Sequence, residues 1–154
     1  MKLVKAIYSA PINTLKYHED TGITIVTIKY ENTYYSGIAW LSELDKDFYS
    51  KKVGYNIALS KARIKALQYY YEQEKKKYEQ RYQFFQEVLG HGAKKLAEID
   101  PTSAFSRNLM QLQYRVAAIK EALEKEKTLL RKYVEGQNKA VESVKRFRQK
   151  VDNN

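Results

Sequence analysis

The feature that most constrains the fold is an apolar repeat in the last third of the sequence. Its steps alternate between three and four residues, and only Glu126 and Gln137 interrupt it. The repeat visits Phe105, Leu109, Leu112, Val116, Ile119, Leu123, Glu126, Leu130, Tyr133, Gln137, Ala140, Val144, Phe147 and Val151. Such a repeat lies on one face of an α-helix, and that face stays against a partner helix only when the two helices coil around each other. The sequence therefore predicts a long helix over residues 100–151, packed as a coiled coil.

A helix over residues 100–151 would be longer than the rest of the chain can cover. At 1.5 Å per residue it would reach about 75 Å, which exceeds the diameter of a small domain. The preceding helix is shorter, so part of the apolar face would bury against another copy of the chain. We therefore expect a homo-oligomer. Gly136 costs about 1 kcal/mol inside a helix and marks a candidate kink or end of the coil.

The preceding helix is predicted over residues 50–89. Its apolar stripe consists of Val53, Ile57, Ile64, Leu67, Tyr71, Tyr78 and Phe85. Gly90, His91 and Gly92 are predicted to end it, because glycine readily adopts the left-handed conformation of a helix C-terminus. After a connector at 93–99, Asp100 is the predicted N-cap of the next helix and Pro101 its first residue.

The N-terminal third predicts β-structure. Residues 22–30 and 33–41 are rich in β-branched and aromatic side chains, and the polar pair Glu31 and Asn32 separates them, as in a β-hairpin. Residues 2–9 also look extended and are the predicted third strand. The fold class is therefore α+β in a single domain, 1–154: a small N-terminal antiparallel β-sheet (hairpin 22–41) within residues 1–49, then two long α-helices that form an antiparallel helical hairpin or coiled coil.

The charge of the chain indicates anionic partners. The formal net charge of +10 lies entirely beyond residue 50, because residues 1–50 hold one more acidic than basic side chain. A positive helical body attracts nucleic acid, phosphorylated small molecules or an anionic membrane surface. The chain has no Cys, which excludes disulfides and thiolate chemistry and favours an intracellular protein. With neither a signal peptide nor an 18-residue apolar run, we expect a soluble protein without a membrane partner.

Few residues indicate catalysis. The chain offers no Ser-His-Asp spacing and no glycine-rich loop before a helix, so we expect a protein without catalytic residues or cofactors. His18 and His91 lack the spacing of metal ligands. Asp45 and Asp47 could hold Mg²⁺, or could cap the helix that follows them and favour its N-terminus electrostatically.

The aromatic and basic side chains of the two helices carry more information. Tyr69, Tyr70, Tyr71, Tyr78, Tyr82, Phe84 and Phe85 lie among lysines and arginines, a combination that suits stacking on a base beside a neutralised phosphate. Tyr71, Tyr78 and Phe85 are in register with the apolar stripe, so for these three we expect a place in the core instead. Arg107, Arg115 and Arg131, with Asn108 and Lys127, could gather in a pocket between chains or remain ordinary surface residues.

One stretch resembles a known family. It comprises the motif GIA at 37–39, then Asp45 and Asp47, then GYNIALSKAR at 54–63. With the order of a small sheet and two long helices, the chain resembles the first family of Thoeris anti-defence proteins, which bacteriophages use to sequester the cyclic ADP-ribose signal of the bacterial Thoeris system without cleaving it. The resemblance covers the whole length in architecture and about 25 residues in motif.

The resemblance implies a non-catalytic function in the cytoplasm of an infected bacterial host. It implies a homo-oligomer, dimer-based and up to a hexamer, that binds cyclic ADP-ribose or cyclic oligonucleotides between chains. The ligand-binding positions of matching residue type are Phe84, Phe85, Asn108, Lys127 and Arg131. Lys127 departs from the pattern, because the family would have a second arginine one turn from Arg131. Two alternatives stay open: a basic phage accessory protein that binds nucleic acid, and a structural coiled-coil adaptor.

Overall fold

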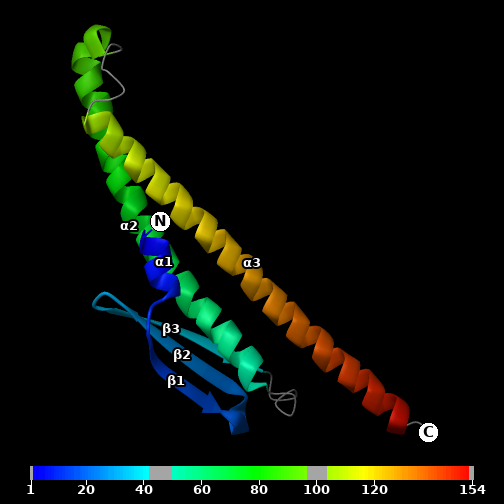
Figure 1. Ribbon diagram of the computed structural model, residues 1–154. Coiled ribbons are helices and arrows are strands. Elements are labelled where there is room, and N and C mark those ends of the chain that lie inside the picture. The colour runs from blue at the N-terminus through cyan, green and yellow to red at the C-terminus, as the bar shows by residue number, and fades with distance from the viewer. Residues whose placement is uncertain (1, 42–49, 97–103, 153–154) are drawn as a thin grey trace.

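The computed structural model describes the backbone of residues 2–41, 50–96 and 104–152, and the side chains of 2–41, 50–87 and 107–149. Two long helices, α2 (Lys51–Leu96) and α3 (Ala104–Asp152), pack against each other in opposite directions as a helical hairpin. A three-stranded sheet lies against the lower part of α2, and a short helix, α1, lies near the middle of the hairpin and contacts both long helices (Figure 1). The predicted α+β fold class is therefore confirmed.

The sheet has the order β1-β2-β3 and is antiparallel throughout. Its strands are β1 (Ile12–His18), β2 (Ile23–Tyr30) and β3 (Thr33–Trp40), with a 3-10 turn, η1 (Glu19–Thr21), between the first two. The predicted hairpin is confirmed, since Tyr30 pairs with Thr33 across a turn in which Glu31 adopts a φ of 53°. A positive φ is uncommon for residues other than glycine, asparagine, aspartate and histidine, but it costs an unbranched glutamate less than a β-branched residue.

The prediction that residues 2–9 form a strand was wrong. They form α1 (Lys2–Tyr8), whose Ile7 is buried in the core, and the third strand follows Pro11. Leu3, Val4 and Ile7 have the spacing of one helical face, which a run this short does not distinguish from an extended segment. β1 gives almost no signal in the sequence, because all but one of its side chains are exposed.

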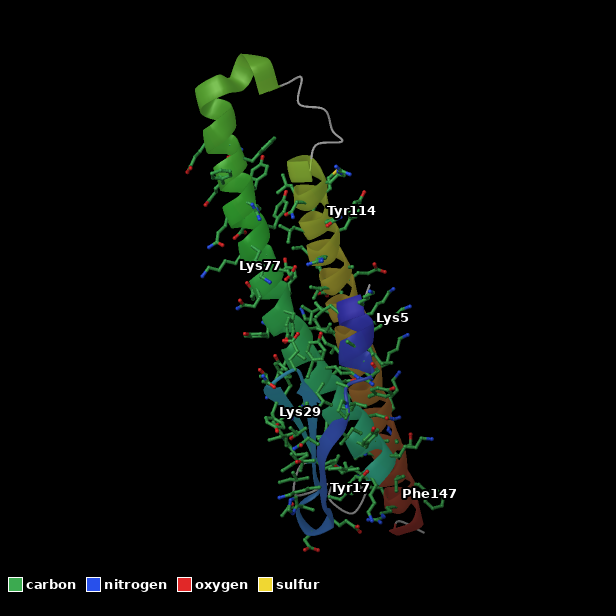
Figure 2. All side chains as sticks on the ribbon, turned by 60° about the vertical axis from the view of Figure 1, so that its left-hand side comes forward. Lys5, Tyr17, Lys29, Lys77, Tyr114 and Phe147 are labelled. Carbon is green, nitrogen blue, oxygen red and sulfur yellow. The ribbon has the colours of Figure 1, made fainter. Side chains whose placement is uncertain are left out.

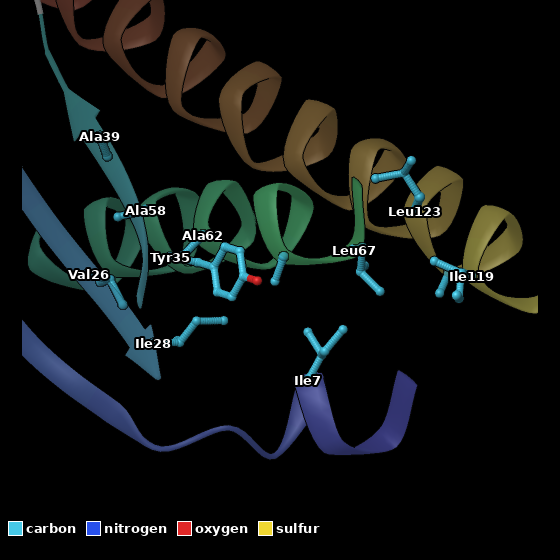
Figure 3. Packing of buried hydrophobic residues seen from close by; sticks show 12 residues of the cluster. Ile7, Val26, Ile28, Tyr35, Ala39, Ala58, Ala62, Leu67, Ile119 and Leu123 are labelled. Atoms are coloured by element: carbon cyan, nitrogen blue, oxygen red, sulfur yellow. The ribbon is translucent and has the colours of Figure 1, made fainter. Parts of the chain in front are cut away.

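Alternation on the sheet determines which face α2 covers. Thr24, Val26 and Ile28 of β2 are buried, and so are the inward positions of β3. Ala58, Ala62 and Ala66 recur every fourth residue on α2 and form a small-residue stripe that lets the helix approach the sheet (Figure 3). At Gly37 the approach is so close that a Cβ atom would overlap the backbone of Ala58 and Ala62.

The long helices differ from the sequence prediction at their ends. α2 does not end at residues 90–92 but continues to Leu96, because glycine permits a helix end without imposing one and costs only about 1 kcal/mol in a helix. α3 likewise continues through Gly136 to Asp152, so the helix does not end at that glycine. The predicted cap at Asp100 and Pro101, with residues 97–99 of the connector, lies outside the described residues.

The apolar face of α3 is covered only in part. Ile119, Leu123 and the interrupting Glu126 are buried against α1 and α2, and their neighbours on the repeat are half-buried. Towards the C-terminus the repeat emerges into solvent, with Val144 40% and Phe147 68% exposed. The expectation that one chain leaves part of this face uncovered is confirmed for these residues, and its burial by a second copy stays a prediction.

Glu126 interrupts the apolar repeat because it joins three helices. Its carboxylate is 1% exposed and accepts hydrogen bonds from Ser60 Oγ of α2 at 2.7 Å and from the Tyr8 hydroxyl of α1 at 2.8 Å. Arg63 stacks on the Tyr8 ring, with its guanidinium carbon 4.9 Å from the centroid, and its Nη2 donates to the Tyr8 carbonyl oxygen. Burial, and then the hydrogen bond to Glu126, raises the pKa of Tyr8.

Candidate ligand-binding groove

A groove between α2 and α3 collects several of the side chains that could bind a nucleotide. It has a volume of about 530 Å³ and is lined by Lys77, Gln80, Arg81, Phe84, Asn108 and Leu112. On α2, Gln80 and Arg81 each lie three or four positions from both Lys77 and Phe84, so the four residues share one face of that helix. The other two come from the first turns of α3, which runs alongside in the opposite direction.

The groove brings an aromatic ring beside cationic and amide groups. Phe84 is 53% exposed, and Arg81 and Asn108 are exposed next to it. Lys77, which is labelled in Figure 2, keeps 60% of its side chain exposed although its Nζ donates to Glu74 Oε1 at 2.7 Å. An aromatic ring flanked by cations can stack on a base while a phosphate is neutralised beside it. This combination therefore suits an anionic nucleotide.

The structure brings together two of the five ligand-binding positions predicted from the sequence. Phe84 and Asn108 both line the groove, although one lies on α2 and the other on α3. Phe85 is half-buried and is not part of the groove lining. Its partial burial, like that of Tyr71 and Tyr78, agrees with the alternative that these residues pack in the hairpin.

Lys127 and Arg131 lie elsewhere on α3. They follow Asn108 by 19 and 23 positions, which corresponds to roughly 28 and 35 Å along a helix and to rotations of about 100° and 140° around it. Lys127 pairs with Glu124 at 2.9 Å, and Arg131 Nη2 donates to Thr128 Oγ1 at 3.3 Å. The hydrogen bond from Lys127 is the largest cause that lowers the pKa of Glu124. Within one chain, Lys127 and Arg131 therefore cannot contact a ligand held by Phe84 and Asn108.

Sequence reasoning missed the cations that line the groove. Lys77 and Arg81 were part of a general basic background on α2 and were not singled out. A more specific signal was present, because these residues precede Phe84 by seven and three positions and so lie on its side of the helix. Arg115, an arginine considered for the ligand site, lies instead 3.7 Å from Glu74 Oε2.

The tyrosines of α2 that do not belong to its apolar stripe divide into two groups. Tyr69 is 47% and Tyr82 42% exposed, as expected for surface side chains. Tyr70 instead packs edge-on against Tyr30, with ring centroids 5.2 Å apart, and its hydroxyl donates to Glu31 at 2.7 Å. Burial, and then this hydrogen bond, raises the pKa of Tyr70. Tyr70 therefore fixes the end of the β2–β3 hairpin to α2.

The described residues offer little support for a metal site or a membrane-spanning segment. The described part of the chain holds no group of three or more His, Cys, Asp or Glu side chains that could bind a metal ion, and Asp45 and Asp47 lie outside it. None of the described helices is long and apolar enough to cross a membrane.

A scan against protein-family models, a search of curated proteins and a search of solved structures each found no match. The function is therefore inferred from the residues of the groove.

Proposed function

We propose that this chain is a non-catalytic protein that binds an anionic nucleotide in the groove between α2 and α3. The observation that carries the proposal is the half-exposed Phe84 ring beside Arg81, Lys77 and Asn108. The ring would stack on the base, the two cations would neutralise the phosphates, and the amide would hydrogen-bond to the ligand. Capture of a ligand requires only these contacts and no group that makes or breaks bonds.

The ligand we propose is a cyclic nucleotide signal of the cyclic ADP-ribose type. Its adenine and pyrophosphate match the chemistry of the groove, and the resemblance to Thoeris anti-defence proteins is consistent with sequestration. In this proposal the protein acts in the cytoplasm of an infected bacterium, where it removes an immune signal. Lys127 and Arg131 would take part only if another copy of the chain brings them to the groove.

Assembly is part of the proposal, because the groove is open and α3 has exposed apolar side chains. Met110 is 47% and Tyr114 68% exposed, and they lie one helical turn apart on α3 (Tyr114 is labelled in Figure 2). Large apolar groups gathered on a surface are typical of protein interfaces. A second copy that covers them would bind the face of α3 away from the groove, since Asn108 lies two positions, or about 200° of rotation, from Met110, and Leu112 lies two positions from both Met110 and Tyr114.

The test is titration calorimetry of the full chain with cyclic ADP-ribose isomers, combined with native mass spectrometry. Ligand should be recovered intact after heat denaturation. Phe84→Ala should lower the affinity at least about fivefold, because one stacked base contributes roughly 1–3 kcal/mol. Arg81→Ala should also weaken binding, because it removes a cation beside the ring. Its control is Arg146→Ala, since Arg146 is exposed near the far end of α3 and pairs only with Glu142 among the described residues. If the wild-type chain binds no cyclic ADP-ribose isomer, the proposed ligand is wrong.

The open face of the sheet favours a second candidate function, the binding of single-stranded nucleic acid. α2 covers one face, and the other carries Trp40, 67% exposed, and Tyr34, 54% exposed. Lys61 Nζ lies 4.6 Å from the Trp40 ring centroid, and Lys29 Nζ lies 5.6 Å from that of Tyr34. Exposed aromatic rings beside lysines on a sheet can stack bases of any sequence.

The two candidate functions are distinguished by the binding affinities of variants and by the salt dependence of DNA binding. If the sheet binds nucleic acid, Trp40→Ala should weaken the binding of a short DNA oligonucleotide, measured by fluorescence anisotropy, and the affinity should fall steeply with salt. Phe84→Ala should leave that affinity unchanged. Loss of nucleotide binding in Phe84→Ala, without any DNA binding by the wild type, would support the groove alone.

A further inference from the structure

A second hollow lies where α1 packs against α2 and α3. We call it the proximal hollow; it has a volume of about 480 Å³ and is lined by Lys2, Leu3, Ala6, Tyr30, Glu74 and Arg115. Figure 1 shows α1 close to the long helices near the middle of the hairpin, and α1 contacts both of them. The proximal hollow adjoins the α2–α3 groove, because Glu74 of the hollow pairs with Lys77 of the groove.

Glu74 places in the wall of the proximal hollow a hydrogen-bond acceptor that has no donor among the described residues. Glu74 is only 7% exposed, and its Oε1 accepts a hydrogen bond from Lys77 Nζ at 2.7 Å. Its Oε2 is buried and has no hydrogen-bond partner among the described residues, and Arg115 Nη1 lies 3.7 Å away. Buried polar atoms in folded proteins are almost always paired. This oxygen, in the wall of a hollow, is therefore placed to accept an N–H or O–H group from a ligand.

The charges around Glu74 define the rest of the ligand. Lys2 and Arg115 line the hollow, and Lys77 adds a third positive charge beside the Glu74 carboxylate. The local excess of positive charge favours a group with two negative charges, such as a phosphate monoester, over a carboxylate. An ammonium group would compete with these cations for the carboxylate, so the donor that fits Oε2 is a neutral amine.

Tyr30 and the apolar wall suit the body of such a ligand. Burial, and then the nearby Glu31 carboxylate, raises the pKa of Tyr30, so its phenol stays neutral at physiological pH. Leu3 and Ala6 of α1 add an apolar wall. A planar base in contact with an aromatic ring and aliphatic groups removes apolar surface from water while its polar edge stays free for recognition.

We propose that the proximal hollow binds a nucleoside monophosphate whose base carries an exocyclic amino group, at a site separate from the α2–α3 groove. The amino group donates to Glu74 Oε2, and the phosphate contacts Arg115 and Lys2. The base lies against Tyr30. A base with a carbonyl in place of the amino group would bring two acceptors together at Glu74, so the hollow selects for the amine.

The test compares adenosine and inosine monophosphates, which differ in the amino group, by titration calorimetry of the full chain. The wild type should bind adenosine monophosphate at least about tenfold more tightly than inosine monophosphate. Glu74→Gln should reverse or abolish this preference, because a glutamine amide can donate to the inosine carbonyl. Glu142→Gln is the control, since Glu142 is exposed and pairs with Arg146 four residues along α3.

Two further variants keep the proposal falsifiable if Glu74→Gln does not fold. Arg115→Gln should weaken adenosine monophosphate about tenfold while the affinity for adenosine stays unchanged. Phe84→Ala should leave the preference between the two monophosphates intact, which separates this site from the groove. The proposal is overturned if the wild type binds both monophosphates equally or neither, if Phe84→Ala abolishes their binding, or if Glu74→Gln keeps the wild-type preference.

Discussion

The two halves of the α2–α3 hairpin are built from different residues and serve different purposes. Near the sheet, Ala58, Ala62, Ala66 and Leu67 of α2 are completely buried, and Ile119 of α3 packs with them (Figure 3). Farther along the hairpin, none of the side chains at 75–87 or 107–118 is fully buried. The first half holds the fold together, whereas the second leaves charged and aromatic side chains on its surface, where the proposed ligand would bind.

The difference shows how a small basic protein can combine a fixed core with an adaptable surface. Dense packing of alanines against the sheet fixes where α2 points, and the Glu126 network fixes α1 and α3 to it. The outer half of the hairpin has fewer buried contacts and is therefore expected to open more easily than the core. Substitutions should accordingly cost much stability in the first half and little in the second.

The largest effect is expected for Gly37→Ala. A Cβ atom at residue 37 would overlap the backbone of α2, which cannot move without separating from the sheet, so unfolding free energy should fall by about 3 kcal/mol or more. Gly136→Ala is the matched control, because a Cβ atom there meets nothing within 4 Å and alanine stabilises a helix by about 1 kcal/mol relative to glycine. Urea denaturation measures both. Equal effects of the same sign would contradict the packing described for the sheet.

A smaller loss is expected for Glu126→Ala. The change removes the acceptor of the Ser60 and Tyr8 hydroxyls inside the protein, which should cost about 2–3 kcal/mol of unfolding free energy. Glu142→Ala removes an exposed pair with Arg146 and should change stability by less than about 0.5 kcal/mol. If both substitutions cost the same, the buried network does not contribute to the core as described.

Sequence reasoning identified the elements in which buried side chains recur at a regular spacing along the sequence. β2 and β3 alternate, and the middle of α3 repeats every three and four residues, so both were predicted. β1 is exposed on nearly every side chain and leaves no alternation. The role of Glu126 could not be read from its neighbours, because its partners Tyr8 and Ser60 lie 118 and 66 positions away in the sequence.

The candidate site was predictable in residue type but not in arrangement. Phe84 and Asn108 were selected because they suit stacking and hydrogen bonding, and the groove contains both. Which cations join them depends on how α2 and α3 align, and the segment between the helices has no periodic pattern that would fix this alignment. Arg131 was predicted as a ligand-binding residue and Arg115 was not, yet Arg115 lines the proximal hollow and Arg131 lies far along α3.

The smallest effect concerns the tyrosines of the packed half at alkaline pH. Burial is the first cause that raises the pKa of Tyr8, Tyr30, Tyr35 and Tyr70 above the ordinary value of 10.0. The unfolded chain releases these protons near pH 10 while the folded chain retains them. Their contribution is therefore fully present below pH 10 and is lost as the pH rises through the folded pKa values. Burial of Lys61 lowers its pKa and acts in the opposite direction, but as one group against four.

Unfolding free energy should consequently fall as the pH rises above about 10, and tyrosinate absorbance should increase together with unfolding. Tyr70→Phe removes one retained proton and should make this fall less steep. Tyr114→Phe serves as the control, because Tyr114 is 68% exposed on the outer half of the hairpin. An equal change of slope in the two variants would mean that the packed half does not hold its tyrosines differently from the open half, which would remove the electrostatic part of the contrast between them.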